Sequence, residues 1–367
     1  MRTTSGFSPG TGAKFQNWRW VGVACRIRAE MGSEPPSPDL PSGGMPRLGQ
    51  HLLTVLQVVV TVGLLWWLFH DPDRREAMWK ALETADWRWM LAALASAGLC
   101  EFFGIVRWQL FLKMLHLQVR LSEVTRLFFI GAFFNQFLPG TTGGDVVRVI
   151  FLMRDHPEHR TAGFLSVAID RLLAVLVLVA MGLGFAWSRS TWFASSFAVG
   201  NTMKVFAIVL FAIGIGLAAS FLLTSRHLVG RLPARFPMRA QIVKLSTLWQ
   251  LCIENRREAL LGAAYTVPML LFYFGAFYFV GLAFTAKVTF LDMTSIMPLV
   301  TAISSLPISL NGIGVREALF EQLLYELCGV PQGTGLLISI TGMFIYLVWG
   351  IPGGIFYLER IRRRYGK

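Results

Sequence analysis

Two short stretches of this chain combine an arginine with a helix-breaking cluster of proline and glycine. The first is LPGTTGGDVVR at residues 138–148, and the second is LPISLNGIGVR at residues 306–316. Both lie in strongly apolar sequence, and Leu, Pro, Gly and Arg occupy matching places in the two. Unwound backbone at membrane depth is tolerated only where it is buried in protein or lines a cavity. The pair therefore indicates a site that binds or moves something inside a bilayer.

The first stretch has the residues of an anion site. Gly143 and Gly144 precede Asp145 and Arg148 at the point where a half-helix would begin. Free N–H groups and the positive end of the helix dipole attract anions, and a guanidinium adds a fork of donors suited to phosphate. In the alternative, structural interpretation, Asp145 caps the helix and pairs with Arg148, while the glycines only permit a tight turn.

Asp170 and Arg171 are charged neighbours in a second apolar run. A charge at mid-bilayer costs from about 2.5 to over 10 kcal/mol, so each such residue is a candidate for function. Because sequence neighbours point to different sides of a helix, we expect one of the two to face the site and the other a partner such as Arg148 or Asp145. A purely structural buried network is the alternative.

The second stretch differs chemically from the first. Asn311 stands in place of a glycine, and Arg316 is followed by Glu317. We assign Asn311, Arg316 and Glu317 to a gate opposite the main headgroup site, with a structural role as the alternative. The helix breaks themselves are expected at Pro139 and Pro307.

Three further residues complete the candidate set. Asn135 precedes the first break, where it can hydrogen-bond a headgroup or satisfy backbone groups freed by the break. Glu101 and Arg107 are secondary candidates, and their spacing of six residues is unsuited to pairing. Arg107 is close enough to its span end to extend to the interface, whereas Glu101 is nearer mid-membrane. We find no metal site and no catalytic motif such as HExxH or a nucleophile–base pair.

The elements that must position these residues are membrane helices. Hydrophobic residues make up 54% of the chain, charged residues 15%, and the mean hydropathy is +0.55, far more apolar than a soluble protein. Runs long enough to span a bilayer occur at about 50–70, 89–112, 162–187, 203–223, 260–285 and 335–358. The interrupted runs, about 124–154 and 295–328, are each either one long span or a re-entrant hairpin of two half-helices.

The distribution of basic residues favours re-entrant hairpins. With both runs re-entrant, most of the Lys and Arg behind the net charge of +13 fall on one side, as the positive-inside rule requires. A full span at 124–154 would instead place the basic linker 226–257 outside. We therefore expect an all-α polytopic membrane protein of the cell inner membrane, with six full spans, two hairpins in an inverted repeat and both termini cytoplasmic. No nucleic-acid-binding module is present.

The remaining segments are expected to be peripheral. Residues 1–49 contain no apolar core of signal-peptide length, and we predict a disordered cytoplasmic tail, with Met31 and Met45 as alternative starts. The linker 226–257 is predicted to carry an amphipathic helix on the cytoplasmic surface, and residues 361–367 a basic tail. The four cysteines are scattered, so neither a disulfide framework nor a zinc site is indicated. The predicted apolar side of the linker helix consists of Ile242, Val243, Leu245, Leu248 and Trp249.

Three stretches taken together resemble the signature of one family. They are FNQFLPGTTGGDVVR at 134–148, SVAIDRL at 166–172, and SLP at 305–307 with NGIGVRE at 311–317. The combination resembles the lysylphosphatidylglycerol synthase transmembrane region, also called flippase-like domain proteins, over about residues 50–360. The resemblance implies a multi-spanning membrane protein that translocates an anionic, aminoacylated or glycosylated lipid. The synthases carry a large soluble transferase domain after this region, whereas this chain stops at Lys367, so only flipping or lipid binding is expected.

These observations favour one function and leave two others open. The leading prediction is translocation of an anionic phospholipid or a polyprenyl-phosphate-linked lipid through a central polar cavity, with no cofactor and no catalysis. The main alternative is a membrane enzyme, or an accessory subunit that binds a partner enzyme, in glycolipid or terpenoid-lipid synthesis. An ion-coupled carrier of a small solute is a third option, which the family resemblance disfavours.

Overall fold

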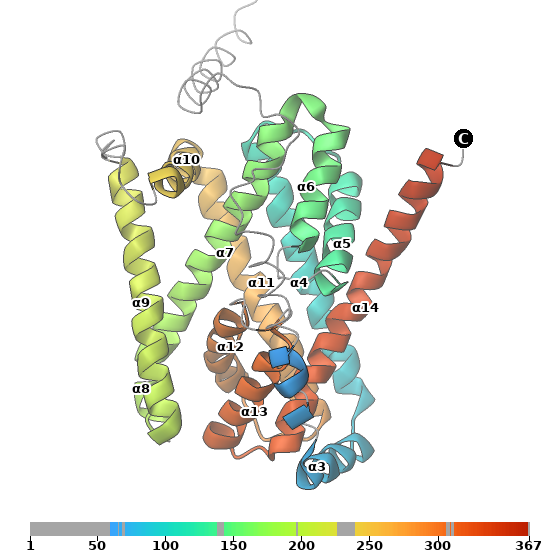
Figure 1. Cartoon of the computed structure of the whole chain (residues 1–367), viewed down its shortest axis with the longest axis vertical. Coiled ribbons are helices and arrows are strands. Elements are labelled where there is room, and N and C mark those ends of the chain that lie inside the picture. Colours follow the sequence, from blue (N-terminus) through green and yellow to red (C-terminus); the bar gives the residue numbers. More distant parts are fainter. Residues whose placement is uncertain are drawn as a thin grey trace, which may run out of the picture. The chain divides into compact units, whose positions relative to one another are not determined.

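The described part of the chain is helical throughout and contains no strand (Figure 1). The computed structural model describes residues 59–64, 66–67, 70–137, 143–195, 197–225, 239–305, 309 and 312–365. Its helices are α3 (Pro72–Glu83), α4 (Trp87–Met114), α5 (Leu121–Phe137), α6 (Gly143–Asp155), the 3-10 turn η1 (Pro157–His159), α7 (Arg160–Ser188), α8 (Ser190–Phe193), α9 (Phe197–Ser225), α10 (Arg239–Glu254), α11 (Arg256–Ala283), α12 (Phe290–Ser304), α13 (Val315–Cys328) and α14 (Gln332–Tyr365).

Five of these helices are long and apolar enough to cross a membrane. They lie within α4, α7, α9, α11 and α14 and correspond to five of the six predicted spans. The sixth, predicted at 50–70, falls mostly outside the described residues. The chain is thus a multi-pass, all-helical membrane protein. The segment between the first two predicted spans also contains a helix, α3, which hydropathy did not reveal.

Helix ends follow local sequence signals. Asp71 and Asp86 accept backbone N–H groups at the starts of α3 and α4, which satisfies donors that a helix terminus leaves free. Thr289 and Asp292 form a reciprocal capping box at the start of α12. The polar residues between apolar runs therefore determine where these helices begin.

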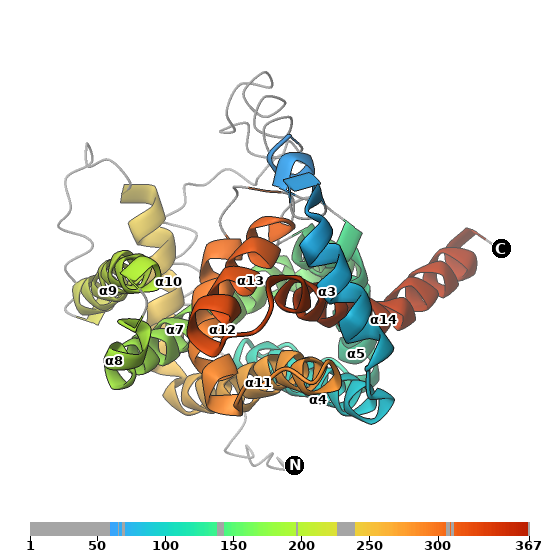
Figure 2. The same cartoon turned by 90° about the horizontal axis from the view of Figure 1, so that it is seen from below.

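Small residues bring α4 and α11 close together, and these helices pack side by side more extensively than any other pair (Figure 2). A Cβ added at Gly262 would lie 2.3 Å from the Phe111 ring. Ser96 Oγ on α4 donates a 2.8 Å hydrogen bond to the Phe272 carbonyl on α11. Close backbone approach with interhelical hydrogen bonds is how helices associate where lipid removes the hydrophobic driving force.

Each interrupted run consists of two short helices. The pair α5 and α6 has 17 and 13 residues, and the pair α12 and α13 has 15 and 14. At 1.5 Å per residue each helix is about 20–25 Å long, which is less than the roughly 30 Å hydrocarbon core. In Figure 1 the outer ends of α5 and α6 lie at the end of the bundle where α10 lies, and those of α12 and α13 at the end of α3. Pro139, Pro307 and Asn311 lie outside the described residues.

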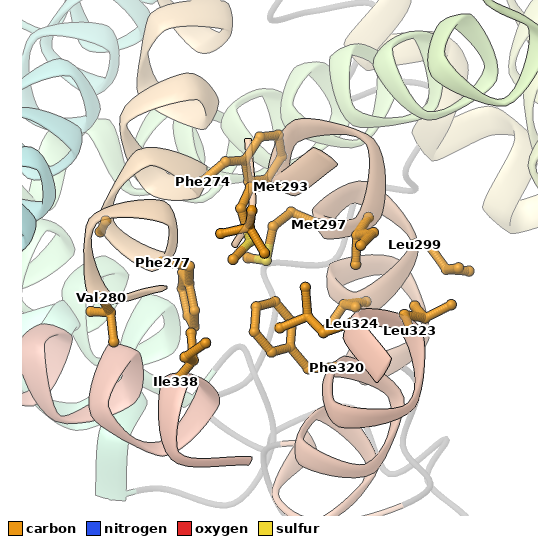
Figure 3. Close-up of a cluster of buried hydrophobic side chains, with 14 of the residues drawn as sticks. Phe274, Phe277, Val280, Met293, Met297, Leu299, Phe320, Leu323, Leu324 and Ile338 are labelled. Carbon is orange, nitrogen blue, oxygen red and sulfur yellow. The ribbon is translucent and has the colours of Figure 1, made fainter. Parts of the chain in front are cut away.

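The two pairs of short helices pack against different hydrophobic clusters. One is built from α11, α12, α13 and α14, where Phe277, Met293 and Phe320 are almost completely buried (Figure 3). The other surrounds Trp108 and Leu127 between α4, α5 and α6. α4 and α7 contribute residues to both clusters, so these two helices connect the two pairs of short helices.

The basic linker contains the predicted amphipathic helix as α10. Trp249 is buried, and its Nε1 donates a 2.8 Å hydrogen bond to Ser220 Oγ on α9. Burial also raises the pKa of the Cys252 thiol on α10 to about 11. The apolar side of α10 is therefore packed on the spans, while residues 226–238 lie outside the described residues.

Candidate functional site

Arg148 lies at the centre of a charged network that joins α4, α6 and α7. Its side chain is buried, with 3% of the residue exposed. Arg148 Nη2 lies 3.2 Å from Asp145 Oδ1, one turn earlier on α6, and 3.6 Å from Asp170 Oδ2 on α7. Arg171 Nε donates a 2.6 Å hydrogen bond to Asp145 Oδ2. Asp170 and Arg171 therefore point to different partners, as expected for neighbours on a helix.

Arg107 completes the network, and the prediction that it extends to the membrane surface is wrong. It is 5% exposed, and its Nη2 lies 2.8 Å from Asp170 Oδ1. Its Nη1 donates a 3.0 Å hydrogen bond to Thr266 Oγ1 on α11. A counter-charge at the same depth removes the need for the guanidinium to reach water, because a buried ion pair compensates much of the desolvation. We call Arg107, Asp145, Arg148, Asp170 and Arg171 the charged network.

Two aromatic rings pack against the guanidinium of Arg148. Its Cζ lies 4.2 Å from the ring centroid of Trp108 and 5.5 Å from that of Phe128. The Trp108 ring is fully buried and is fixed by a 3.2 Å hydrogen bond from Nε1 to Ser166 Oγ. Stacking on an aromatic face leaves the edge of the guanidinium plane available for anions.

Asn135 caps the start of α6, a role for which Asp145 was the alternative candidate from the sequence. The Gly144 N–H donates a 2.8 Å hydrogen bond to Asn135 Oδ1 on α5. Gly144 also permits the crossing of α5 and α6, because a Cβ there would lie 1.9 Å from the Gly131 carbonyl oxygen. Asp145 is thus free to pair with two arginines, and α6 begins at Gly143.

The network has unused hydrogen-bonding capacity and an excess of positive charge. Arg148 Nε and Nη2 and Arg107 Nε are buried without a hydrogen-bond partner of suitable geometry, although both side chains have ion-pair neighbours. Buried polar atoms without partners are rare in native proteins and call for an explanation. Three guanidinium groups against two carboxylates leave one net positive charge. The arrangement can therefore accept an anion.

Arg316 and Glu317, at the start of α13, are held differently from the residues of the charged network. Glu317 is 2% exposed, accepts the Gly314 N–H at 2.6 Å and pairs with Arg316 at 3.0 Å. Ser339 Oγ on α14 donates to Glu317 as well. Gly312 and Gly314 have positive φ values of 75° and 86°, which explains why glycines stand there. Arg316 and Glu317 thus form a pair of their own, without a direct contact to the charged network.

Two ion pairs that involve α12 and α13 are not predicted by the sequence pattern. Arg74 Nη1 on α3 lies 3.2 Å from Glu321 Oε2 on α13, and Arg189 Nη1 lies 2.7 Å from Asp292 Oδ1 on α12. Glu321 follows Glu317 by one helical turn. Two acids at this spacing within an apolar run are the sequence signal that indicates a second buried charge with a partner elsewhere. The partner arginines carry no such signal, because they belong to polar segments.

Glu101, unlike Arg107 on the same helix, is not ion-paired with the charged network. Glu101 is partly exposed and makes no hydrogen bond or ion pair with the residues that the structure describes. The central cavity stays a prediction. A pocket of about 340 Å³ lies instead near the end of α6, lined by Ile150, Met153, Arg154 and Pro157.

Sequence comparison assigns the chain to a family. The sequence profile of the lysylphosphatidylglycerol synthase TM region matches residues 54–353. The chain belongs to this family. The matched range includes α4 to α7, which hold the charged network, and both pairs of short helices. The chain is also similar to UPF0104 membrane protein PH1989 of Pyrococcus horikoshii, with 27% identity over 334 residues, which cover 84% of this chain and 97% of that protein.

Proposed function

We propose that this protein translocates a lipid with an anionic, phosphate-containing headgroup between the leaflets, and that Arg148 binds the headgroup. The observation that carries the proposal is the buried Arg148 in the second turn of α6, whose Nε and Nη2 lack a hydrogen-bond partner of suitable geometry. A phosphate oxygen is an acceptor of the required charge, and a guanidinium binds it with two parallel hydrogen bonds. Membership of the lysylphosphatidylglycerol synthase TM region family supports a lipid as the bearer of that phosphate.

The arrangement of the short helices supports movement of the headgroup. In the proposed mechanism, α5–α6 and α12–α13 are re-entrant hairpins that enter from opposite faces, so that a headgroup at their inner ends is reached from either side. The excess of basic residues near α10 and the C-terminus orients that end toward the cytoplasm.

A reconstitution assay tests this function. Purified protein is placed in vesicles that contain phosphatidylglycerol labelled on its headgroup, and dithionite then reports the fraction of label on each side. Wild type should move the label across, and Arg148→Gln should reduce the rate at least tenfold. The exposed Arg363 on α14 provides a matched control as Arg363→Gln, which should behave like wild type.

Loss of folding is separated from loss of function by a second variant. Arg148→Lys keeps the positive charge and loses the bidentate fork, so it should fold and translocate at an intermediate rate. Wild-type rates in both Arg148 variants would overturn the assignment of the headgroup site. Chromatography of the recovered lipid distinguishes translocation, which leaves the lipid unchanged, from an enzymatic reaction.

A further inference from the structure

Glu101 lies near the middle of α4 on the side that faces the charged network. Trp108 follows Glu101 by seven positions, or about two helical turns, which places both on one face of the helix. The lipid-facing side of the same turn carries Leu99 and Phe102, which are 43% and 56% exposed. Glu101 shares its side of α4 with the buried Ala97, Gly104 and Trp108, which places its carboxyl group toward the interior of the bundle. There a carboxyl group can exchange a proton without contact with lipid.

Among the residues that the structure describes, no cation is paired with Glu101 alone. Arg148 is the cation whose charge reaches it, and that arginine is already paired with Asp145 and Asp170. The ionisable side chains of α5 are Glu123 and Arg126. Both lie in the first two turns of α5, at the opposite end of the helix from Asn135. The ionisable side chains that interact electrostatically with Glu101 are Cys100 on α4, Arg148 on α6 and Tyr346 on α14. Tyr346 in turn packs on Tyr273 of α11, and the charged network adds Arg107 on α4 and Asp170 and Arg171 on α7.

Charge balance links Glu101 to the headgroup. The charged network has a net charge of +1, and an ionised Glu101 reduces the total to zero. A phosphodiester headgroup would then bring the total to −1 inside the membrane, where an uncompensated charge costs several kcal/mol. One proton on Glu101 restores neutrality when the headgroup is bound.

We propose that Glu101 is a proton-binding site that takes up one proton when an anionic headgroup binds at Arg148. This inference rests on the proposed function. The proton comes from the aqueous side to which the site is open, and the Glu101 carboxylate accepts it. The proton and the lipid then leave together on the other side. A proton gradient would thereby drive net movement of the lipid.

Calorimetry in buffers of different ionisation enthalpy measures the proton directly. Dihexanoyl phosphatidylglycerol is titrated into the detergent-solubilised protein near pH 7. Wild type should take up about one proton per lipid bound. Glu101→Gln should bind the lipid and take up none, because its amide does not titrate. Glu76→Gln removes an acid from the exposed surface of α3 and should retain the wild-type proton uptake.

The outcomes separate this inference from the proposed function. Binding by wild type without proton uptake, or equal uptake by Glu101→Gln, overturns the role of Glu101 alone. Absence of binding by wild type, or unchanged binding by Arg148→Gln, overturns the proposed function as well. Should Glu101→Gln fail to fold, wild type still provides a test. Its affinity should fall up to tenfold per pH unit over the range in which the proton is taken up, and a pH-independent affinity refutes the inference.

Discussion

Replacement of Gly144 by alanine should disrupt the crossing of α5 and α6 on which the site depends. The added Cβ would lie 1.9 Å from the Gly131 carbonyl oxygen, and contacts below 3.0 Å are essentially never observed. The difference, 3.0 − 1.9, means that the two backbones must separate by at least 1.1 Å. The Gly131 carbonyl oxygen belongs to the backbone of α5, and the backbone of α6 fixes the position of the added Cβ. No side chain can therefore rotate to relieve the clash.

The separation has an energetic cost from two sources. Overpacking of a tight contact costs about 1–3 kcal/mol. The hydrogen bond from Gly144 N–H to Asn135 Oδ1, now 2.8 Å, would lengthen beyond hydrogen-bonding distance, and loss of such a cap costs about 1 kcal/mol. The sum is about 3 kcal/mol, which at about 2 °C per kcal/mol lowers the apparent Tm by about 6 °C.

Two other glycines serve as matched controls. Gly131→Ala would bring its Cβ to 3.2 Å from the Gly144 carbonyl oxygen, so a small adjustment suffices and the loss should be under half as large. Gly184→Ala on α7 meets nothing within 4 Å and should be neutral or slightly stabilising, because alanine favours the helix.

Thermal unfolding in detergent and lipid translocation in vesicles provide the measurements. Gly144→Ala should unfold at the lowest temperature of the three variants and translocate at least tenfold more slowly than wild type, because Arg148 moves with α6. Equal stability and activity of Gly144→Ala and Gly184→Ala would refute the argument from the backbone contact.

Two further predictions concern the residues that hold the network together. Asp170→Asn should destabilise the protein by about 3–5 kcal/mol, because Arg107 and Arg148 would lose the carboxylate that they share and remain buried. The double variant Arg107→Leu with Asp170→Leu should recover much of this loss in the same thermal unfolding assay, and a double variant as unstable as Asp170→Asn would contradict the ion-pair explanation. Asn135→Ala should cost about 1 kcal/mol through loss of the α6 cap, and Asn135→Asp should restore it, since aspartate also accepts the Gly144 N–H. Unchanged stability of Asn135→Ala would mean that another group caps α6.

Much of the fold and of the site's composition could be predicted from residue types and spacing. Runs of apolar residues predicted five spans that the structure contains, because about 20 apolar residues are needed wherever a helix crosses a bilayer. The two interrupted runs each contain a pair of short helices, α5 with α6 and α12 with α13, in keeping with the proline and glycine content of these runs. The charges that form the network were all among the candidates, since a charge in apolar sequence stands out.

The partners of these charges could not be predicted in the same way. The sequence predicts an interfacial position for Arg107 because it shows only the distance of this residue from the end of the run. Its partner Asp170 lies on another helix. Asn135 caps a helix that begins eight residues later, across a break whose geometry no local pattern specifies. The Arg74–Glu321 pair joins segments far apart in the chain, so neither residue indicated the other.

The sequence by itself determined which segments form the long apolar helices and which charges lie within apolar sequence. These properties depend on the solvation and backbone conformation of neighbouring residues, which local sequence records. Only the tertiary structure decided that Arg107, Arg148 and Arg171 share two aspartates and leave one positive charge in excess. Contacts between helices depend on crossing angles and on close approach at residues such as Gly131 and Gly144, and these emerge only when the whole bundle packs.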